Sequence, residues 1–208
     1  MSNLKDIRTK LERLQGAKIR VERDIERTNI ELKEQNRDLR FHQQAREIVH
    51  EVGLKTQRQL EYHISNLVTL AEESVFTDPY EFEVQFVERR NKTECDLLFK
   101  RDDNFMKPID SSGLGAVDVA GFALRIASWS MEHPRSRPVI IMDEPFKHLK
   151  GFDENVRVIA MTKELSKKLN LQIIMVHDER VPMDEIERGA DKIFNVTKRN
   201  GISNVKEL

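Results

Sequence analysis

Two adjacent carboxylates follow a short apolar run in the C-terminal half of the chain. Residues 138–145 read P-V-I-I-M-D-E-P, so Asp143 and Glu144 come directly after four apolar residues. Such a run predicts a buried strand, which would deliver both carboxylates to one edge of a sheet. Adjacent carboxylates repel each other, and a fold that holds them together usually provides a cation or a reacting water. An ordinary strand followed by an acidic turn is the alternative interpretation.

A second segment with chemical potential lies upstream, where serines and glycines precede an apolar helical pattern. Residues 110–127 read D-S-S-G-L-G-A-V-D-V-A-G-F-A-L-R-I-A. The polar start predicts a loop, and the later spacing predicts a helix with one apolar face. Free N–H groups at a helix start attract anions, and Ser111 and Ser112 add hydroxyl groups. Since Gly113 and Gly115 allow a close approach, the segment predicts a phosphate site.

A histidine follows a second apolar strand pattern further along the chain. Residues 171–180 read L-Q-I-I-M-V-H-D-E-R, and His177 is the first polar residue after the apolar run. Residues 153–169, between the two predicted strands, have amphipathic helical spacing. The strand, helix, strand order predicts a right-handed parallel crossover, which places both strand ends on one side of the sheet. The helix residues expected to face inward are Val156, Ile159, Ala160 and Leu165.

The N-terminal third has the seven-residue spacing of a coiled coil. The apolar seam weakens after Ile25, and charged residues occupy most other positions. Because such a helix has too little core to fold alone, we expect it to pair with a partner helix. No proline precedes Pro79, so the helix can continue to about residue 74. The seam consists of Leu4, Leu11, Lys18, Ile25, Leu32 and Leu39, interleaved with Ile7, Leu14, Val21, Thr28, Gln35 and His42.

A β-hairpin is predicted between the helix and the serine-containing segment. Residues 80–90 alternate strictly between apolar and polar types, and residues 93–100 follow after a short polar turn. We expect residues 101–110 to form a loop that leads into the serine-containing segment. In the predicted helix after it, Asp118 complements the helix dipole, and His148 is expected at the surface of a loop.

The order of these motifs resembles the C-terminal lobe of the ABC-type ATPase head of SMC proteins and of double-strand-break-repair ATPases, including SbcCD-type and phage recombination nucleases. The resemblance covers roughly residues 105–208 and, through the coil, the N-terminal part. It implies an α/β fold, the C-terminal half of an ABC-type head with a parallel sheet, flanking helices and a β-hairpin. It also implies two domains: residues 1–74 as a descending coiled-coil arm and residues 75–208 as the head lobe. Residues 190–205 are similar to the closing strand and hairpin of such heads.

The resemblance implies roles for the polar residues and two cofactors, ATP and Mg²⁺. Asp143 would help to hold Mg²⁺ through water, and Glu144 would polarise the water that attacks ATP. His177 would sense the γ-phosphate. Ser112 and Gly113 would cap ATP that is bound to the opposite head of a dimer.

Four features depart from the family pattern, one of them the absence of a glutamine or glutamate that closes the signature. Leu114 takes the place of the usual second glycine, with Gly115 after it, so Ser111 could substitute for Ser112 in the alignment. Lys150 stands where the D-loop of the family has an aspartate. None of the eight glycines begins G-x-x-x-x-G-K-[ST], the P-loop pattern. Since that loop contacts the β- and γ-phosphates, we expect negligible ATPase activity from the chain alone.

Two classes of function follow. The first is the head half of an SMC-like ATPase in DNA repair or recombination, active only with a P-loop-bearing N-terminal lobe and its ascending coil. It would be a naturally split half or a fragment, and its second head would form a dimer. DNA and a nuclease subunit are partners by resemblance only. The second is a non-catalytic coiled-coil interaction module that docks to or regulates a partner ATPase.

The composition of the chain argues against several other classes of protein. Thirty-five Lys plus Arg balance thirty-six Asp plus Glu, so the overall charge does not indicate nucleic-acid binding. The single cysteine, Cys95, cannot form an internal disulfide and is compatible with a reducing compartment. No stretch has the apolar length of a signal peptide or a membrane span, so we expect a cytoplasmic protein with no membrane partner.

Overall fold

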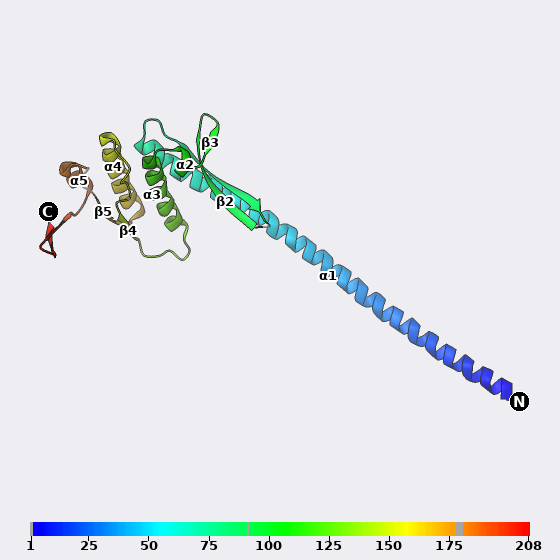
Figure 1. Ribbon diagram of the computed structural model, residues 1–208. Coiled ribbons are helices and arrows are strands. Elements are labelled where there is room, and N and C mark those ends of the chain that lie inside the picture. The colour runs from blue at the N-terminus through cyan, green and yellow to red at the C-terminus, as the bar shows by residue number, and fades with distance from the viewer. Residues whose placement is uncertain (1, 91, 178–180) are drawn as a thin grey trace. The chain divides into compact units, whose positions relative to one another are not determined.

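The computed structural model describes residues 2–90, 92–177 and 181–208 (Figure 1). The chain divides into two compact units, Met1–Thr56 and Gln57–Leu208. The first helix, α1 (Ser2–Val75), begins in the first unit and ends in the second. The predicted domain boundary at residue 74 lies at the end of this helix, whereas the last turns of α1 already belong to the second unit.

In the first unit, α1 exposes the apolar seam that the sequence predicts. Leu11 and Ile25 expose 54% and 55% of their surface. An exposed seam of this length favours pairing with another helix, because the apolar side chains gain free energy when they leave water. The coiled-coil partner itself stays a prediction.

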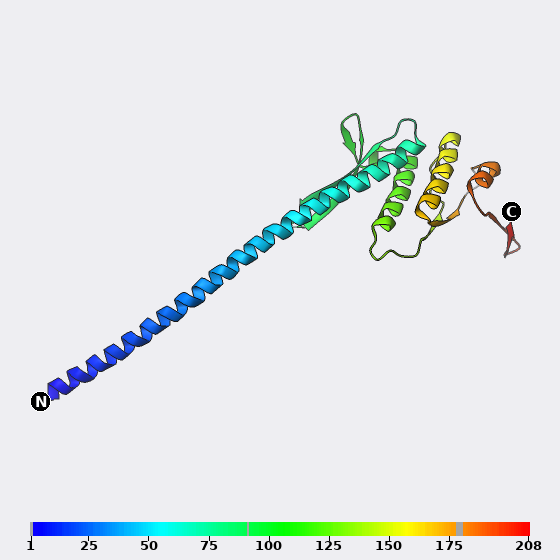
Figure 2. The same ribbon diagram turned by 180° about the vertical axis from the view of Figure 1, so that it is seen from behind.

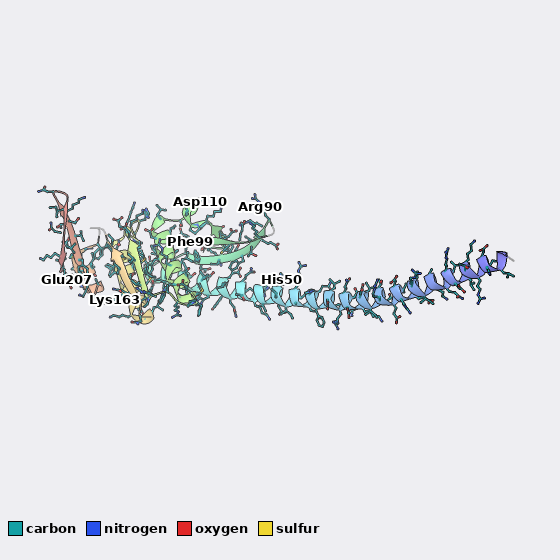
Figure 3. All side chains as sticks on the ribbon, turned by 90° about the horizontal axis from the view of Figure 1, so that it is seen from below. His50, Arg90, Phe99, Asp110, Lys163 and Glu207 are labelled. Carbon is teal, nitrogen blue, oxygen red and sulfur yellow. The ribbon has the colours of Figure 1, made fainter. Side chains whose placement is uncertain are left out.

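The predicted hairpin is confirmed in the second unit. Strands β1 (Glu81–Arg89) and β2 (Lys92–Arg101) pair in antiparallel register. Phe99 on β2 is fully buried (Figure 3), and its ring lies 5.8 Å from that of Phe82. The aromatic side chains thus anchor the hairpin to the core.

The expectation of a loop over residues 101–110 was wrong. Strand β3 (Asn104–Met106) pairs with β2, and the one-turn helix α2 (Pro108–Ser111) follows it. Asp102 and Asp103 both have positive φ values, 49° and 63°, which produce a tight turn that returns the chain to β2. Aspartate tolerates this left-handed conformation better than most residues, but hydrophobic periodicity does not reveal it.

The last turns of α1 cover the outer edge of β1. Three side-chain oxygens on α1, spaced four residues apart, accept hydrogen bonds from alternate N–H groups of β1. We call this set the α1–β1 ladder. It satisfies strand donors that would otherwise remain unpaired at the edge of the sheet. Its pairs are Glu61 with Phe86 at 2.9 Å, Ser65 with Val84 at 3.0 Å and Thr69 with Phe82 at 2.9 Å.

A parallel crossover forms the other half of the second unit. Strand β4 (Val139–Asp143) lies parallel to β5 (Gln172–Val176), and α4 (Phe152–Leu169) connects them. Helix α3 (Leu114–Met131) lies beside α4 in both views (Figures 1 and 2). The predicted strand–helix–strand order is therefore confirmed.

The inward face predicted for α4 was partly wrong. Val158 and Met161 are buried, whereas Ala160 is exposed. The buried face also includes the polar side chains of Asn155 and Thr162, which bond to backbone carbonyl groups. Because these two residues are polar, apolar spacing alone shifts the predicted face around the helix.

The C-terminal segment contains a short helix and the predicted hairpin. Helix α5 (Met183–Gly189), which the sequence did not indicate, is followed by β6 (Phe194–Arg199) and β7 (Ile202–Glu207) in antiparallel register. One face of this hairpin exposes Phe194, Val196 and Val205. None of the described helices combines the length and the apolar character needed to cross a membrane.

Candidate functional site

The candidate catalytic residues meet at the carboxyl ends of β4 and β5. Asp143 pairs in register with Val176, so Glu144 and His177 are the next residues on neighbouring strands. The N–H group of Glu144 donates a hydrogen bond to the carbonyl oxygen of Val176 at 3.0 Å. Since neighbouring strands lie about 4.8 Å apart, the structure brings the three polar residues to one edge of the sheet.

Glu144 has an unusual backbone conformation at this edge. Its φ is 43°, in the left-handed region that costs a non-glycine residue roughly 1–2 kcal/mol. Pro145 follows, and the chain then turns back, with the N–H group of Lys147 donating to the carbonyl oxygen of Glu144 at 3.2 Å. A strained conformation at a strand end is typical of functional sites, because the surrounding fold must maintain it.

The two carboxylates remain available for an external ligand. Both Asp143 and Glu144 are exposed, and neither side chain forms an ion pair or hydrogen bond with another described residue. Within the described ranges, no group of three or more His, Cys, Asp or Glu could enclose a metal ion. One or two carboxylates without a closed cage fit Mg²⁺, which keeps several of its own water ligands.

The predicted phosphate-binding segment lies at the junction of α2 and α3. Ser111 is the last residue of α2, and Gly113 is the N-cap of α3. The hydroxyl group of Ser112 donates a hydrogen bond to the carbonyl oxygen of Pro108, so it does not point toward a ligand as a donor here. A Cβ on Gly113 would contact nothing within 4 Å, so the backbone at this helix start is open to an approaching group.

A polar contact that sequence reasoning missed joins this helix to the loop after Glu144. Asp118 on α3 accepts a hydrogen bond from the backbone N–H of His148 at 2.8 Å, and its carboxylate also lies 3.2 Å from Nδ1 of His148. Asp118 was expected only to complement the helix dipole, and His148 only to occupy the surface. Instead the pair ties the two candidate segments together.

Apolar packing supports the same connection. A Cβ added to Gly115 would come within 3.2 Å of the Leu149 side chain, so α3 approaches the loop closely at this point. The rings of Phe122 and Phe146 lie 5.2 Å apart. Gly115, Asp118 and Phe122 share one face of α3 by their spacing, which is the signal that could have predicted the contact. Lys150 is exposed at the end of this loop.

The outer face of the β4–β5 pair is apolar and exposed. Ile141 exposes 72% of its surface and Val176 exposes 54%, while Met142 on the inner face is buried. Among the strands that the structure describes, β4 and β5 pair only with each other, so each keeps one open edge. Parallel strands are usually covered on both faces, so this pair lacks a layer that such sheets require.

Comparisons with known proteins identify the fold. No family model and no curated protein matches the chain. The Smc head domain with a coiled coil and joint from Pyrococcus yayanosii is 21% identical, with a TM-score of 0.60 over 88% of this chain and 35% of that chain. The Smc head domain of Pyrococcus furiosus, with an extended coiled coil and bound to the C-terminal domain of ScpA, is 21% identical, with a TM-score of 0.55 over 76% of this chain.

A third structure comes from work on ATP-driven dimerization and DNA-stimulated activation of SMC ATPases. It is 20% identical to this chain, with a TM-score of 0.53, and the match covers 74% of this chain and 88% of that one. By contrast, this chain spans only 36% of the Pyrococcus furiosus chain. At these identities the likeness concerns the fold alone. This chain therefore has the α/β fold of an SMC head domain with its coiled coil, which confirms the fold class that the sequence predicted.

Proposed function

We propose that this chain is one half of an ABC-type ATPase head and hydrolyses ATP only together with a P-loop-bearing lobe. The observation that carries this proposal is the position of Asp143, Glu144 and His177 at one edge of an incompletely covered parallel sheet. Side chains at the carboxyl ends of parallel strands are well placed to act on a ligand in the adjoining crevice.

Each residue at the sheet edge has a role in this proposal. Asp143 would hold Mg²⁺ through water, and the ion would supply positive charge for the phosphate oxygens. Glu144 accepts a proton from the attacking water, and its exposed carboxylate is not engaged by another described side chain. His177, at the end of the neighbouring strand, contacts the γ-phosphate.

The start of α3 provides the second part of the proposed site. The N–H groups in the first turn of a helix lack helical acceptors and attract anions. We therefore assign Ser112 and Gly113 to the cap of an ATP molecule bound by a second head, and Gly115 to close packing behind them. The hydroxyl group of Ser112, which donates to Pro108 here, would turn away from it to donate to a phosphate oxygen. Ser111 is the alternative if the register shifts by one residue.

The exposed surfaces fit a complementary lobe. The outer face of β4 and β5 and the apolar face of the β6–β7 hairpin lack a covering layer among the described residues. A P-loop-bearing lobe would add strands at the open edges, pack other elements on this apolar area and bring its phosphate-binding loop to the same side of the sheet. Its ascending coil would pair with the exposed seam of α1.

The proposed biological role is movement of the coil during DNA repair or recombination. Closure of two heads around ATP would be transmitted to α1, and a nuclease subunit and DNA would be the partners. This part rests on the resemblance of the motifs, and the balanced charge of the chain adds no support to it.

Phosphate release provides the test. The reading frames beside this one are searched for a P-loop, and the product is purified with and without this chain. Alone, this chain should release no phosphate from ATP, whereas the mixture of the two proteins should hydrolyse ATP. Glu144→Gln should abolish ATP hydrolysis by the mixture. The control Glu187→Gln, at an exposed position, should retain it. Steady release by the pure chain that Glu144→Gln removes would contradict the half-head proposal.

Lys150 favours a second candidate, a non-catalytic module that docks to a partner ATPase. A lysine replaces the family's acid in the loop after Glu144, and it is exposed. The double variant Asp143→Asn with Glu144→Gln separates the candidates. If that variant binds the partner and leaves the partner's ATP turnover unchanged, the chain is a non-catalytic module. If turnover is lost while binding is intact, the chain is a catalytic half-head.

A further inference from the structure

Glu72 is a buried carboxyl group near the end of α1. Its side chain has no exposed surface, and neither oxygen has a hydrogen-bond partner among the residues that the structure describes. Val68 and Val75, one turn away on either side, belong to the apolar core. Since buried side-chain oxygens are nearly always hydrogen-bonded, this orphan group requires an explanation.

Among the residues that the structure describes, none provides a cation to Glu72. On α3, the backbone of Ala120 lies near the carboxyl group without completing a hydrogen bond, and buried alanines occupy the rest of that face. The charged groups of α3 are engaged or exposed: Asp118 binds His148, and Arg125 is at the surface. On α4, the guanidinium group of Arg157 donates to the carbonyl oxygen of Val75 at 2.8 Å.

The remaining neighbouring acids do not pair with Glu72 either. On β1, the carboxylate of Glu83 accepts a hydrogen bond from Gln85, and on α1 itself Glu73 is exposed. An ionised carboxylate in such a place would lose its hydration without compensation. Burial accordingly raises the pKa of Glu72 to about 8. The group is neutral below that pH, and the neutral form is the one that fits the core.

The turns of α1 that precede Glu72 are held by stronger contacts. The α1–β1 ladder, made by Glu61, Ser65 and Thr69, attaches the helix to three backbone N–H groups of β1. On the side of α3, the carboxyl group of Glu72 meets the backbone of Ala120, and four of the seven buried residues of α3 are alanines. If Glu72 ionises, water is admitted most easily by separating α1 from α3, because that separation breaks none of the hydrogen bonds of the ladder.

We propose that Glu72 is a proton-operated latch, in which the neutral carboxyl group keeps the end of α1 packed on α3 and loss of its proton loosens this contact. The latch concerns the packing of two helices and does not depend on ATP. One consequence does rest on the proposed function: α3 begins directly after Ser112 and Gly113, so loosening would change the position of the proposed nucleotide cap.

The first test is the pH dependence of unfolding of the full chain. A pKa that is higher in the folded than in the unfolded state stabilises the fold at low pH, and this stabilisation is lost as pH rises from about 4.5 to about 8. The unfolding constant of the wild type therefore rises by up to about tenfold per pH unit in this range. Glu72→Gln removes this slope, whereas the exposed neighbour variant Glu73→Gln retains it.

Hydrogen exchange locates the change. Protection of the amides in residues 66–75 and 114–127 falls by up to about tenfold per pH unit between about pH 6 and pH 8 in the wild type and then levels off, after correction for the intrinsic exchange rate. The amides of β1 keep a higher protection than these two segments at every pH, and Glu72→Gln does not show the fall. An equal fall in Glu72→Gln, or opening of β1 at the same free energy as α1 and α3, would overturn the latch.

A direct titration keeps the proposal testable if Glu72→Gln does not fold. In the wild type labelled with ¹³C at glutamate carboxyl groups, one resonance should titrate with a midpoint near pH 8, far from the others. If all glutamate midpoints lie near the ordinary value of about 4.5, the proposal is wrong.

Discussion

Helix α1 passes through two environments. Comparing them shows which properties of the helix follow from its apolar spacing and which depend on packing against other elements. In the first unit the seam residue Ile25 exposes 55% of its surface, whereas in the second unit Val68 of the same helix exposes none. Ile25 belongs to the predicted seam, and Val68 belongs to a second apolar stripe with Ile64, Ala71 and Val75 at helical spacing. The period therefore marks a face that is able to be buried, and only the presence of β1, α3 and α4 decides that it is buried.

Polar side chains differ between the two regions in the same way. In the first unit, Lys55 and Glu51 form an exposed pair within one helix at 2.8 Å. Near the end of α1, Glu61, Ser65 and Thr69 instead accept hydrogen bonds from another element. Exposed pairs within a helix contribute little, but buried partners of a strand edge contribute substantially more. Substitutions should thus be tolerated in the first region and costly in the second.

The largest contrast is expected for an introduced charge. Val68→Asp places an unpaired carboxylate in the core and should lower the free energy of unfolding of the second unit by at least about 3 kcal/mol. Ile25→Asp, at an exposed position, should change it by less than about 0.5 kcal/mol. Urea unfolding followed by circular dichroism and by Trp129 fluorescence measures both. An equal cost for the two variants would mean that Ile25 is buried by self-association.

A smaller contrast is expected for threonine hydroxyl groups. Thr69→Ala removes the acceptor of the Phe82 N–H group and should cost about 1–3 kcal/mol, because the donor is left unpaired at a partly buried position. The hydroxyl group of Thr28 bonds only to the carbonyl oxygen of Asp24, four residues earlier in the exposed helix. Thr28→Ala should therefore be neutral or slightly stabilising, since alanine favours helix. Chemical unfolding at neutral pH compares the two; a cost for Thr28→Ala that matches Thr69→Ala would contradict the ladder.

Glycine substitutions sharpen the comparison at the scale of single methyl groups. Gly53→Ala adds a Cβ that meets nothing within 4 Å in the middle of α1, so it should stabilise the helix by about 0.5–1 kcal/mol. Gly115→Ala brings a Cβ within 3.2 Å of Leu149, so the crowding should cancel this gain. Thermal unfolding measures both variants. A clear stabilisation by Gly115→Ala would show that the loop after Glu144 yields easily and does not pack firmly on α3.

The smallest effect is expected for an exposed ion pair. Glu51→Gln removes the partner of Lys55, and the melting temperature should change by only about 1 °C. Any change should vanish at about 1 M salt, where the Debye length is near 3 Å. A larger shift that resists salt would indicate that this part of α1 is buried against a partner.

The sequence predicted the positions of the candidate site residues more completely than the loops around them. Asp143 and Glu144 at the end of β4 and His177 at the end of β5 follow from apolar runs and from the rule that a crossover joins parallel strands. Strand β3, helix α2 and helix α5 were missed because they are too short to show a period. Their formation depends on turns such as that at Asp102 and Asp103, and on neighbours already in place.

The sequence by itself determined the local order of the chain. This order comprises the helix spacing of α1 and α3, the alternation of β1 and β2, and the polar residues at two strand ends. It arises from interactions between residues that are near one another in the chain. Tertiary structure alone decided that Asp118 holds His148, that the α1–β1 ladder covers β1, and that Glu72 is left in the core without a hydrogen-bond partner among the described residues. These contacts join residues from separate elements, and their energies depend on burial and geometry that exist only once the chain has folded.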